Sequence, residues 1–167
     1  MVKQSIRASV NEGRRVKKYK LTDETINHNG RTLHRIVALK DFGDVKKGEE
    51  GGFIEKEENL SHDGDCWVSG NVKVYGNAMV YGDARVSGKA RVSENAKVSG
   101  NAWVYGIAMV YGNAKVYGDA RVYGNAMVFG NARVYGNIHL NYDFWYNNDK
   151  LDMMRTPLYQ ALMKDVE

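Results

Sequence analysis

The sequence of this 167-residue chain predicts an all-β solenoid, in which short strands wind around one axis in stacked layers. Three observations predict this fold class. A valine occupies every sixth position from Val68 to Val134, and Leu140 continues the series. A small apolar residue, usually alanine, follows four positions later, from Val72 to Ile138. Glycine recurs at one fixed position of the same unit, as a corner between short strands requires.

The repeat unit reads Val-Tyr-Gly-Asn-Ala-X, where X varies. Successive Ala, X and Val positions follow the two-residue period of a strand, so Val and Ala should point inward and X outward. Gly and Asn then turn the chain, because both tolerate the left-handed backbone region. Ile107 stands where the unit has Asn, and we expect a β-branched residue to fit a left-handed turn position poorly.

The segments that flank the repeat lack its period. We expect three parts: an N-terminal β cap with a basic arm over residues 1–60, the solenoid over 61–140, and an aromatic and helical C-terminal cap over 141–167. Asn29-Gly30, between apolar runs, predicts a β-hairpin, and the stretch 41–52 reads as a loop. Thr156 as N-cap and Pro157 in the first turn predict a short terminal helix.

Composition and charge narrow the class of protein. The net charge of +4 is concentrated in the first twenty residues, which favours either nucleic-acid contact or a solvated, charged edge. No stretch approaches the ~18 apolar residues of a membrane span, and the first residues lack the apolar segment of a secretory signal. Cys66 is the single cysteine, which excludes an internal disulfide framework and fits a reducing compartment. We therefore expect a cytoplasmic protein.

Over twelve consecutive units, the aliphatic and small positions match the motif of the hexapeptide-repeat family, which this sequence resembles. The resemblance implies a left-handed parallel β-helix with three hexapeptides per coil, here about four regular coils. The segments 36–48, 51–54, 65–68 and 155–158 are similar to those of uncharacterised bacterial and phage hexapeptide-repeat proteins, which are often labelled transferases. If the chain is phage-encoded, its compartment would be the host cytoplasm.

Three units per coil would stack residues about eighteen apart and so define three outer walls. The first wall would carry Met79, Lys97, Lys115 and Arg133. The second would carry Arg85, Trp103, Arg121 and His139. The third would carry Lys73, Arg91, Met109 and Met127. At one corner, stacked amides should hydrogen-bond along the axis, namely Asn77, Asn95, Asn113 and Asn131.

Aromatic side chains follow the aliphatic position in most units. They are Tyr75, Tyr81, Tyr105, Tyr111, Tyr117, Tyr123, Phe129 and Tyr135, and one coil has Ser87, Ser93 and Ser99 instead. Stacked rings would stiffen the corners or offer an adhesive surface. One cluster, on the third wall and its leading corner, is expected to contact a partner protein or a second copy of the chain. Its members are Trp103, Tyr105, Ile107, Met109, Tyr123 and Met127.

The sequence favours a non-enzymatic, rigid binding protein without metal or cofactor. We expect it to bind a partner protein, to form a homo-oligomer, or both. A phage-encoded inhibitor of a host protein would suit this description. The resemblance also implies an alternative, an acyltransferase that uses acyl-CoA with His139 as catalytic base. A second alternative is a nucleotide or nucleic-acid binder. Its basic row would comprise Lys97, Lys115, Arg133, Arg85 and Arg121.

Metal chemistry finds little support in the sequence. A zinc site of the γ-class carbonic anhydrase type, also built on this fold, needs three histidines, and the repeat contains His139 alone. The run from His62 to Cys66 matches no metal-binding spacing, and Cys66 falls on the inward phase just before Val68. We expect Cys66 to be a core residue.

Overall fold

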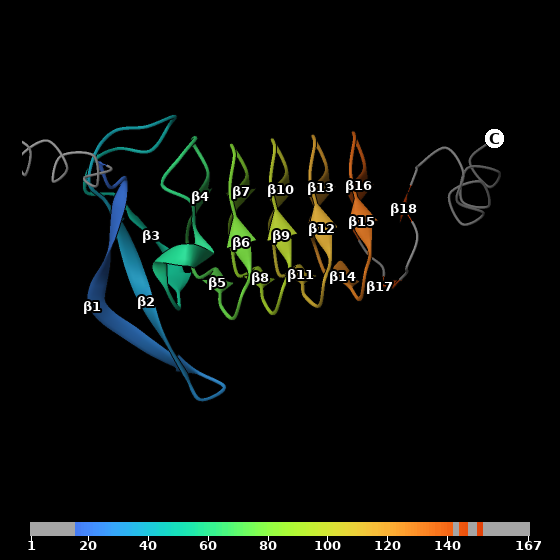
Figure 1. Ribbon diagram of the computed structural model, residues 1–167, viewed down its shortest axis with the longest axis horizontal. Helices are drawn as coiled ribbons and strands as arrows, with labels where there is room; N and C mark the ends of the chain where they lie inside the picture. Colours follow the sequence, from blue (N-terminus) through green and yellow to red (C-terminus); the bar gives the residue numbers. More distant parts are fainter. Residues whose placement is uncertain (1–15, 142–143, 147–149, 152–167) are drawn as a thin grey trace, which may run out of the picture.

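The computed structural model describes residues 16–141, 144–146 and 150–151, which form a three-sided parallel β-solenoid of about five turns (Figure 1). The first wall is built from β6 (Met79–Val80), β9 (Lys97–Val98), β12 (Lys115–Val116), β15 (Arg133–Val134) and β18 (Lys150–Leu151). The second is built from β4 (Trp67–Val68), β7 (Arg85–Val86), β10 (Trp103–Val104), β13 (Arg121–Val122) and β16 (His139–Leu140).

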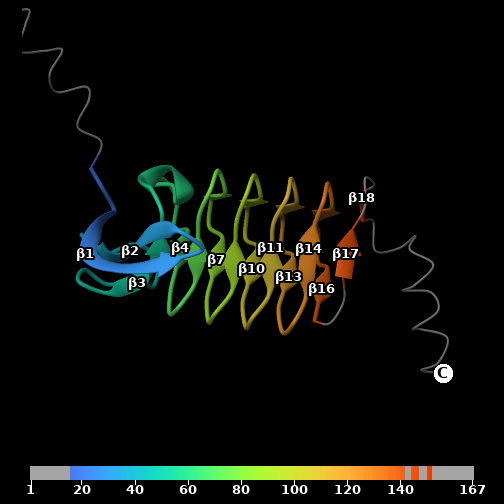
Figure 2. The same ribbon diagram turned by 90° about the horizontal axis from the view of Figure 1, so that it is seen from below.

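The third wall is continuous with the N-terminal cap. It consists of β1 (Tyr19–His28), β2 (Arg31–Ala38), β3 (Glu50–Ile54), β5 (Lys73–Val74), β8 (Arg91–Val92), β11 (Met109–Val110), β14 (Met127–Phe129) and β17 (Phe144–Tyr146). Strands β1 and β2 form the predicted antiparallel hairpin, and β3 joins it to β5 in parallel. The hairpin closes one end of the prism, and the coils follow along a single axis (Figure 2).

Residues eighteen apart pair directly, as the repeat predicts. Val86 pairs with Val104, and Val104 with Val122, in consecutive layers of the second wall. Every repeat valine and alanine is buried in one continuous core. The alternation of inward and outward residues gives each unit an apolar face, and the stacking of the coils buries that face, which a single unit could not do alone. The expected fold class is confirmed.

The corners differ from our expectation in one respect. Glycine alone takes the left-handed conformation in nearly every turn, with φ of 66° at Gly70 and 74° at Gly106. The residue after it, where Asn is usual, does not. The expectation that Ile107 is strained at a left-handed position is therefore wrong, because it follows Gly106 with ordinary backbone angles. The exception in the solenoid is Glu94, which occupies the glycine position with a φ of 59°.

The stretch 41–52 was expected to be a loop, but strand β3 begins at Glu50. Gly51 and Gly52 lie inside this strand, and glycine is needed at both positions because neighbouring atoms approach them closely. A Cβ on Gly51 would lie 2.5 Å from Ile36 Cγ1 and 2.7 Å from the carbonyl oxygen of Val68. These glycines let the hairpin pack against the first coil, so they mark close packing and not a flexible connection.

Cap residues also bury the start of the second wall. The side chain of Trp67 points outward from the coil, yet it is buried beneath Phe42, whose ring lies 5.3 Å away at 71°. A 3-10 turn, η1 (Glu57–Asn59), covers the first wall in a similar way, and Asn59 donates to the carbonyl of Ala78 (2.9 Å). The predicted helix around Thr156 and most of the basic arm, residues 1–15, lie outside the described residues.

Candidate functional site

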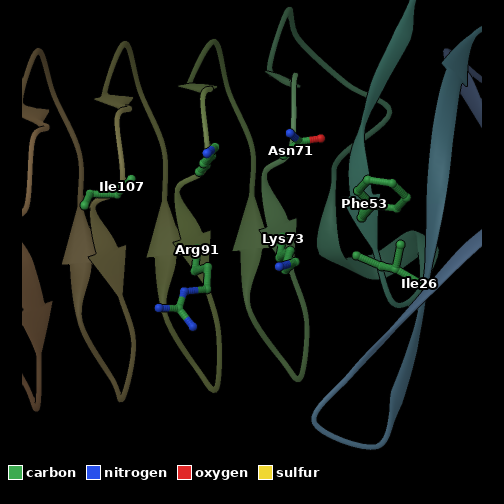
Figure 3. Close-up of a pocket in the computed structure, with 7 residues that line it drawn as sticks. Ile26, Phe53, Asn71, Lys73, Arg91 and Ile107 are labelled. Carbon is green, nitrogen blue, oxygen red and sulfur yellow. The ribbon is translucent and has the colours of Figure 1, made fainter.

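A groove of about 610 Å³ lies where the hairpin approaches the third wall (Figure 3). Its lining comprises Ile26, Phe53, Asn71, Lys73, Lys89, Arg91 and Ile107. The hairpin contributes Ile26, strand β3 contributes Phe53, and the remaining residues come from three consecutive coils. Ile26 and Phe53 lie together at the cap end, and Ile107 lies at the other end of the groove (Figure 3).

The middle of the groove is positively charged. Lys73, Lys89 and Arg91 contribute three cations, and within the described part of the chain none of them pairs with a carboxylate. Lys73 and Arg91 are register partners on adjacent strands, so their charges stack one layer apart. Like charges placed directly opposite each other in a sheet are destabilising. A bound anion would offset this repulsion, so this face favours anion binding.

His28 shares this electrostatic environment. Burial lowers its pKa, and the nearby charges of Lys73 and Arg91 lower the pKa further. Its ring packs edge-on against Tyr75, with centroids 5.1 Å apart. The Nε2 atom is buried and has no hydrogen-bond partner among the described residues. His28 is therefore neutral at pH 7, and a bound carboxylate or phosphate would favour its protonation.

The groove residues were largely absent from the sequence-based candidates. Ile107 belonged to the predicted contact cluster, whereas Ile26, Phe53 and Lys89 did not. The six-residue period places residues within the solenoid, but it carries no information on how the hairpin folds back along a wall. The signal that could have helped is the apolar character of Ile26 and Phe53 on a segment that lacks the period.

The predicted contact cluster is spread over two walls and a corner. Tyr105 and Tyr123 stack with centroids 4.9 Å apart, and Met109 pairs in register with Met127 on the third wall. Trp103 lies on the second wall instead, 48% exposed, with the Arg121 guanidinium 5.6 Å from its ring. Ile107 is 54% exposed at the corner between them. The cluster is therefore elongated, with Trp103 apart from the methionines.

The predicted basic row separates into two groups. Lys97, Lys115 and Arg133 stack in register on the first wall. Arg85 and Arg121 lie on the second wall, and Arg85 forms an ion pair with Asp44 of the cap. The Asn ladder is present as predicted, with amide hydrogen bonds of 3.1 to 3.2 Å from Asn77 through Asn131.

Histidine and cysteine are placed away from the groove. His139 is exposed on β16, in register with Arg121, and lines neither the groove nor the two smaller cavities at the aromatic corners. Cys66 is a free, buried thiol, as predicted. The described residues contain no cluster of three or more His, Cys, Asp and Glu side chains that could hold a metal ion. Nor does this part of the chain include a helix with the length and hydrophobicity to cross a membrane.

The architecture and the repeat together define a three-sided parallel β-solenoid built from six-residue units. A family profile described as the YdcK β-solenoid repeat matches residues 72–88, 80–94 and 120–136. A protein of Escherichia coli (strain K12), described as uncharacterized acetyltransferase YdcK, is 44% identical over 36 residues, or 22% of this chain. The match covers 11% of that relative, so this chain aligns with about a tenth of its length. The resemblance to hexapeptide-repeat proteins labelled transferases is thus confirmed.

Proposed function

We propose that this protein is a rigid, non-enzymatic binding module whose groove holds an acidic segment of a partner protein. The observation that carries the proposal is a set of three cations, Lys73, Lys89 and Arg91, which pair with no carboxylate of the described residues and lie between apolar side chains at both ends. A segment with carboxylates between two apolar residues complements this arrangement in charge and hydrophobicity. Inhibition of a host protein, which the resemblance to phage proteins implies, is one use of such a module.

The length of the groove fits a short extended peptide. The three cations lie on two adjacent layers, ~4.8 Å apart, and with the next layer, that of Ile107, the groove extends over ~10 Å. An extended chain covers ~3.3 Å per residue, and three or four partner residues would therefore occupy it. Because backbone hydrogen bonds fix each layer to the next, the groove is preorganised and loses little conformational entropy on binding.

Peptide binding measured by fluorescence anisotropy tests this proposal. The probe is a labelled peptide with three Asp or Glu residues between Phe and Leu, compared with a Lys-containing peptide of the same length. Lys89→Glu should weaken binding of the acidic peptide about tenfold or more, because it reverses a charge inside the groove. The matched control is Lys115→Glu, which makes the same change in net charge on the first wall. Equal weakening in both variants, or no preference for the acidic peptide, would contradict the proposal.

We also propose that the chain self-associates through the exposed cluster around Trp103 and Ile107. Both side chains are about half exposed, and an aromatic and an aliphatic residue of this size commonly anchor protein contacts. Sedimentation velocity should give a mass above that of the monomer, and Trp103→Ala with Ile107→Asn should shift it toward the monomer. A monomeric mass for the unaltered chain would rule out this interface. We place the module in the cytoplasm, where its free thiol would remain reduced.

Acetyl transfer is the second candidate, favoured by the 36-residue match to a protein described as an acetyltransferase. Under this hypothesis His139 would act as the base that deprotonates the acceptor. Its exposed position on β16 would require a neighbouring subunit to enclose the acyl-CoA. Acetyl-CoA binding and turnover that disappear in His139→Ala, with the oligomeric mass unchanged, would favour this function over the binding module. Acetyl-CoA binding that is indifferent to His139 would count against it.

A further inference from the structure

Two of the three aromatic ladders along the corners are interrupted at a single coil. Where the rings are consecutive they stack closely, with centroids 5.2 Å apart for Tyr111 and Phe129 and 5.3 Å for Tyr117 and Tyr135. In the preceding coil, serine replaces the ring in each ladder. Ser93 therefore lies between the Tyr75 and Tyr111 positions, and Ser99 between those of Tyr81 and Tyr117. Each serine leaves a slot with a tyrosine on both sides.

Both slots are open cavities at the surface. The one at Ser93 has a volume of about 210 Å³ and the one at Ser99 about 270 Å³. Since stacked rings in these ladders repeat every 4.9 to 5.3 Å, two rings separated by a missing one lie about twice that distance apart. This spacing admits one planar ring, which would stack on a tyrosine at each face and restore the ladder. A slot of this shape selects flat aromatic groups over aliphatic ones.

The two slots differ in charge. The Ser99 slot is lined by Lys97, Lys115 and Arg133, which follow one another in register on the first wall. Stacked like charges destabilise a sheet, and in the described residues none of the three has a carboxylate partner. A bound anion would offset this repulsion. The Ser93 slot contains Arg91 and Glu94 instead, and the carboxylate of Glu94 disfavours an anion there.

We propose that the Ser99 slot binds a nucleotide, with the base between Tyr81 and Tyr117 and the phosphates on the basic row. Aromatic side chains stack on any base, because every base presents a π-face. Lysine supplies point charges for phosphate oxygens, and Arg133 can bind two of them at once. The same chemistry is presented by a free nucleotide and by a nucleotide within a single strand. This site lies on a different wall from the groove and does not depend on the function proposed for it.

Titration calorimetry with ATP tests the slot, because one substitution fills it with the residue that the repeat itself uses. Ser99→Tyr should complete the ladder and weaken ATP binding about tenfold or more, while leaving the melting temperature unchanged or higher. The matched control is Ser87→Tyr in the same coil. It adds a ring to the ladder that has Ser69 on one side, so it fills no two-sided slot and should leave ATP binding unchanged.

Two further ligands separate the contributions of base and phosphate. Tripolyphosphate should bind more weakly than ATP, and Ser99→Tyr should not affect it. Equal affinity for tripolyphosphate and ATP would overturn the base-stacking part of the proposal, and unchanged ATP binding in Ser99→Tyr would overturn the site. A short single-stranded oligothymidylate that binds more tightly than ATP, and loses its affinity in Ser99→Tyr, would identify nucleic acid as the source of the nucleotide. ATP tighter than the oligonucleotide would identify the free nucleotide.

Discussion

The side-chain nitrogen of Lys18 lies 2.8 Å from the carbonyl oxygen of Cys66 and 3.3 Å from its sulfur, in a site where Lys18 is 1% exposed. The position of this ammonium follows from the hydrogen-bond pattern of the coils. Backbone N–H groups of one coil donate to carbonyls of the next, as Ser69 does to Val86. On the second wall, β4 is the first strand, so no earlier strand donates to the carbonyls at its start. Lys18 satisfies two of them, those of Cys66 and Gly64.

Tyr19 has a similar role beside it. Its hydroxyl donates to the carbonyl oxygen of Leu60 (2.6 Å), and its ring stacks on His62 with centroids 4.2 Å apart. Burial is the main cause that lowers the pKa of Lys18 and raises that of Cys66. The cap therefore closes the open end of the solenoid with side-chain donors where no strand precedes the first coil, and with the backbone of β3 on the third wall. This end of a solenoid would otherwise expose unpaired strand edges.

Replacement of Lys18 should reveal this capping role. Lys18→Met keeps the length of the side chain but leaves the buried carbonyl of Cys66 without its side-chain donor. We expect a loss of about 1–3 kcal/mol in the free energy of unfolding, which urea denaturation would measure. Lys20→Met is the control, because Lys20 is exposed two residues further on, in β1, and should change stability by less than about 0.5 kcal/mol. Equal stability of the two variants would show that the bonds to the first coil contribute little.

Acid should destabilise the fold through two histidines. Burial is the largest cause lowering the pKa of both His28 and His62 from the ordinary value of 6.5. The unfolded chain then binds more protons than the folded one as pH falls through 6.5, so the free energy of unfolding decreases on acidification. Each histidine can lower the free energy of unfolding by at most about 1.4 kcal/mol per pH unit of acidification.

Melting temperatures at pH 7.5, 6.5 and 5.5 would measure this effect. His28→Gln should reduce the dependence on pH, because it removes one of the two groups that take up protons only on unfolding. The measurement at pH 5.5 lies above the range in which Glu55 and Glu57 titrate, since their pKa values are lowered in the fold. A melting temperature that stays constant or rises between pH 7.5 and 5.5 would refute the assignment.

The period of the sequence predicts the coils but not the groove. Val86 and Val104 pair in adjacent layers because each repeat unit contains its own inward face and its own corner glycine. The Asn ladder and the basic row follow directly from the same register. The groove does not, because Ile26 and Phe53 come from a cap whose packing depends on close approach at Gly51. Strain at Ile107 would require two left-handed residues in each turn, whereas glycine alone supplies the turn.

The Asn ladder should contribute modestly to stability. Asn95 accepts a hydrogen bond from Asn77 (3.2 Å) and donates one to Asn113 (3.1 Å), and all three side chains are exposed. Asn95→Ala removes both bonds, and since water competes for them we expect a cost of about 0.5–1.5 kcal/mol. Asn125→Ala is the matched control, a turn asparagine outside this column. Thermal denaturation of the two variants would decide, and an equal shift would assign the effect to the turn and not to the ladder.

Glu94 should be less favourable than glycine at its own position. Its φ of 59° places a side chain where the other solenoid turns have glycine, and an L-residue in this region costs about 1 kcal/mol. Glu94→Gly removes this strain but increases the entropy of the unfolded chain, so a net gain of about 0.5 kcal/mol in the free energy of unfolding is expected.

Gly100→Ala makes the opposite change in the next unit. Its Cβ would lie 2.9 Å from the backbone nitrogen of Gly118, at a φ of 64°, and we expect a loss of at least about 1 kcal/mol. Chemical denaturation would measure the free energy of unfolding of both variants. If Glu94→Gly proved less stable than the unaltered chain, the carboxylate would have to make a compensating contact at the Ser93 slot. ATP and acidic peptide binding should be unaffected by Glu94→Gly, because neither the Ser99 slot nor the groove is lined by this residue.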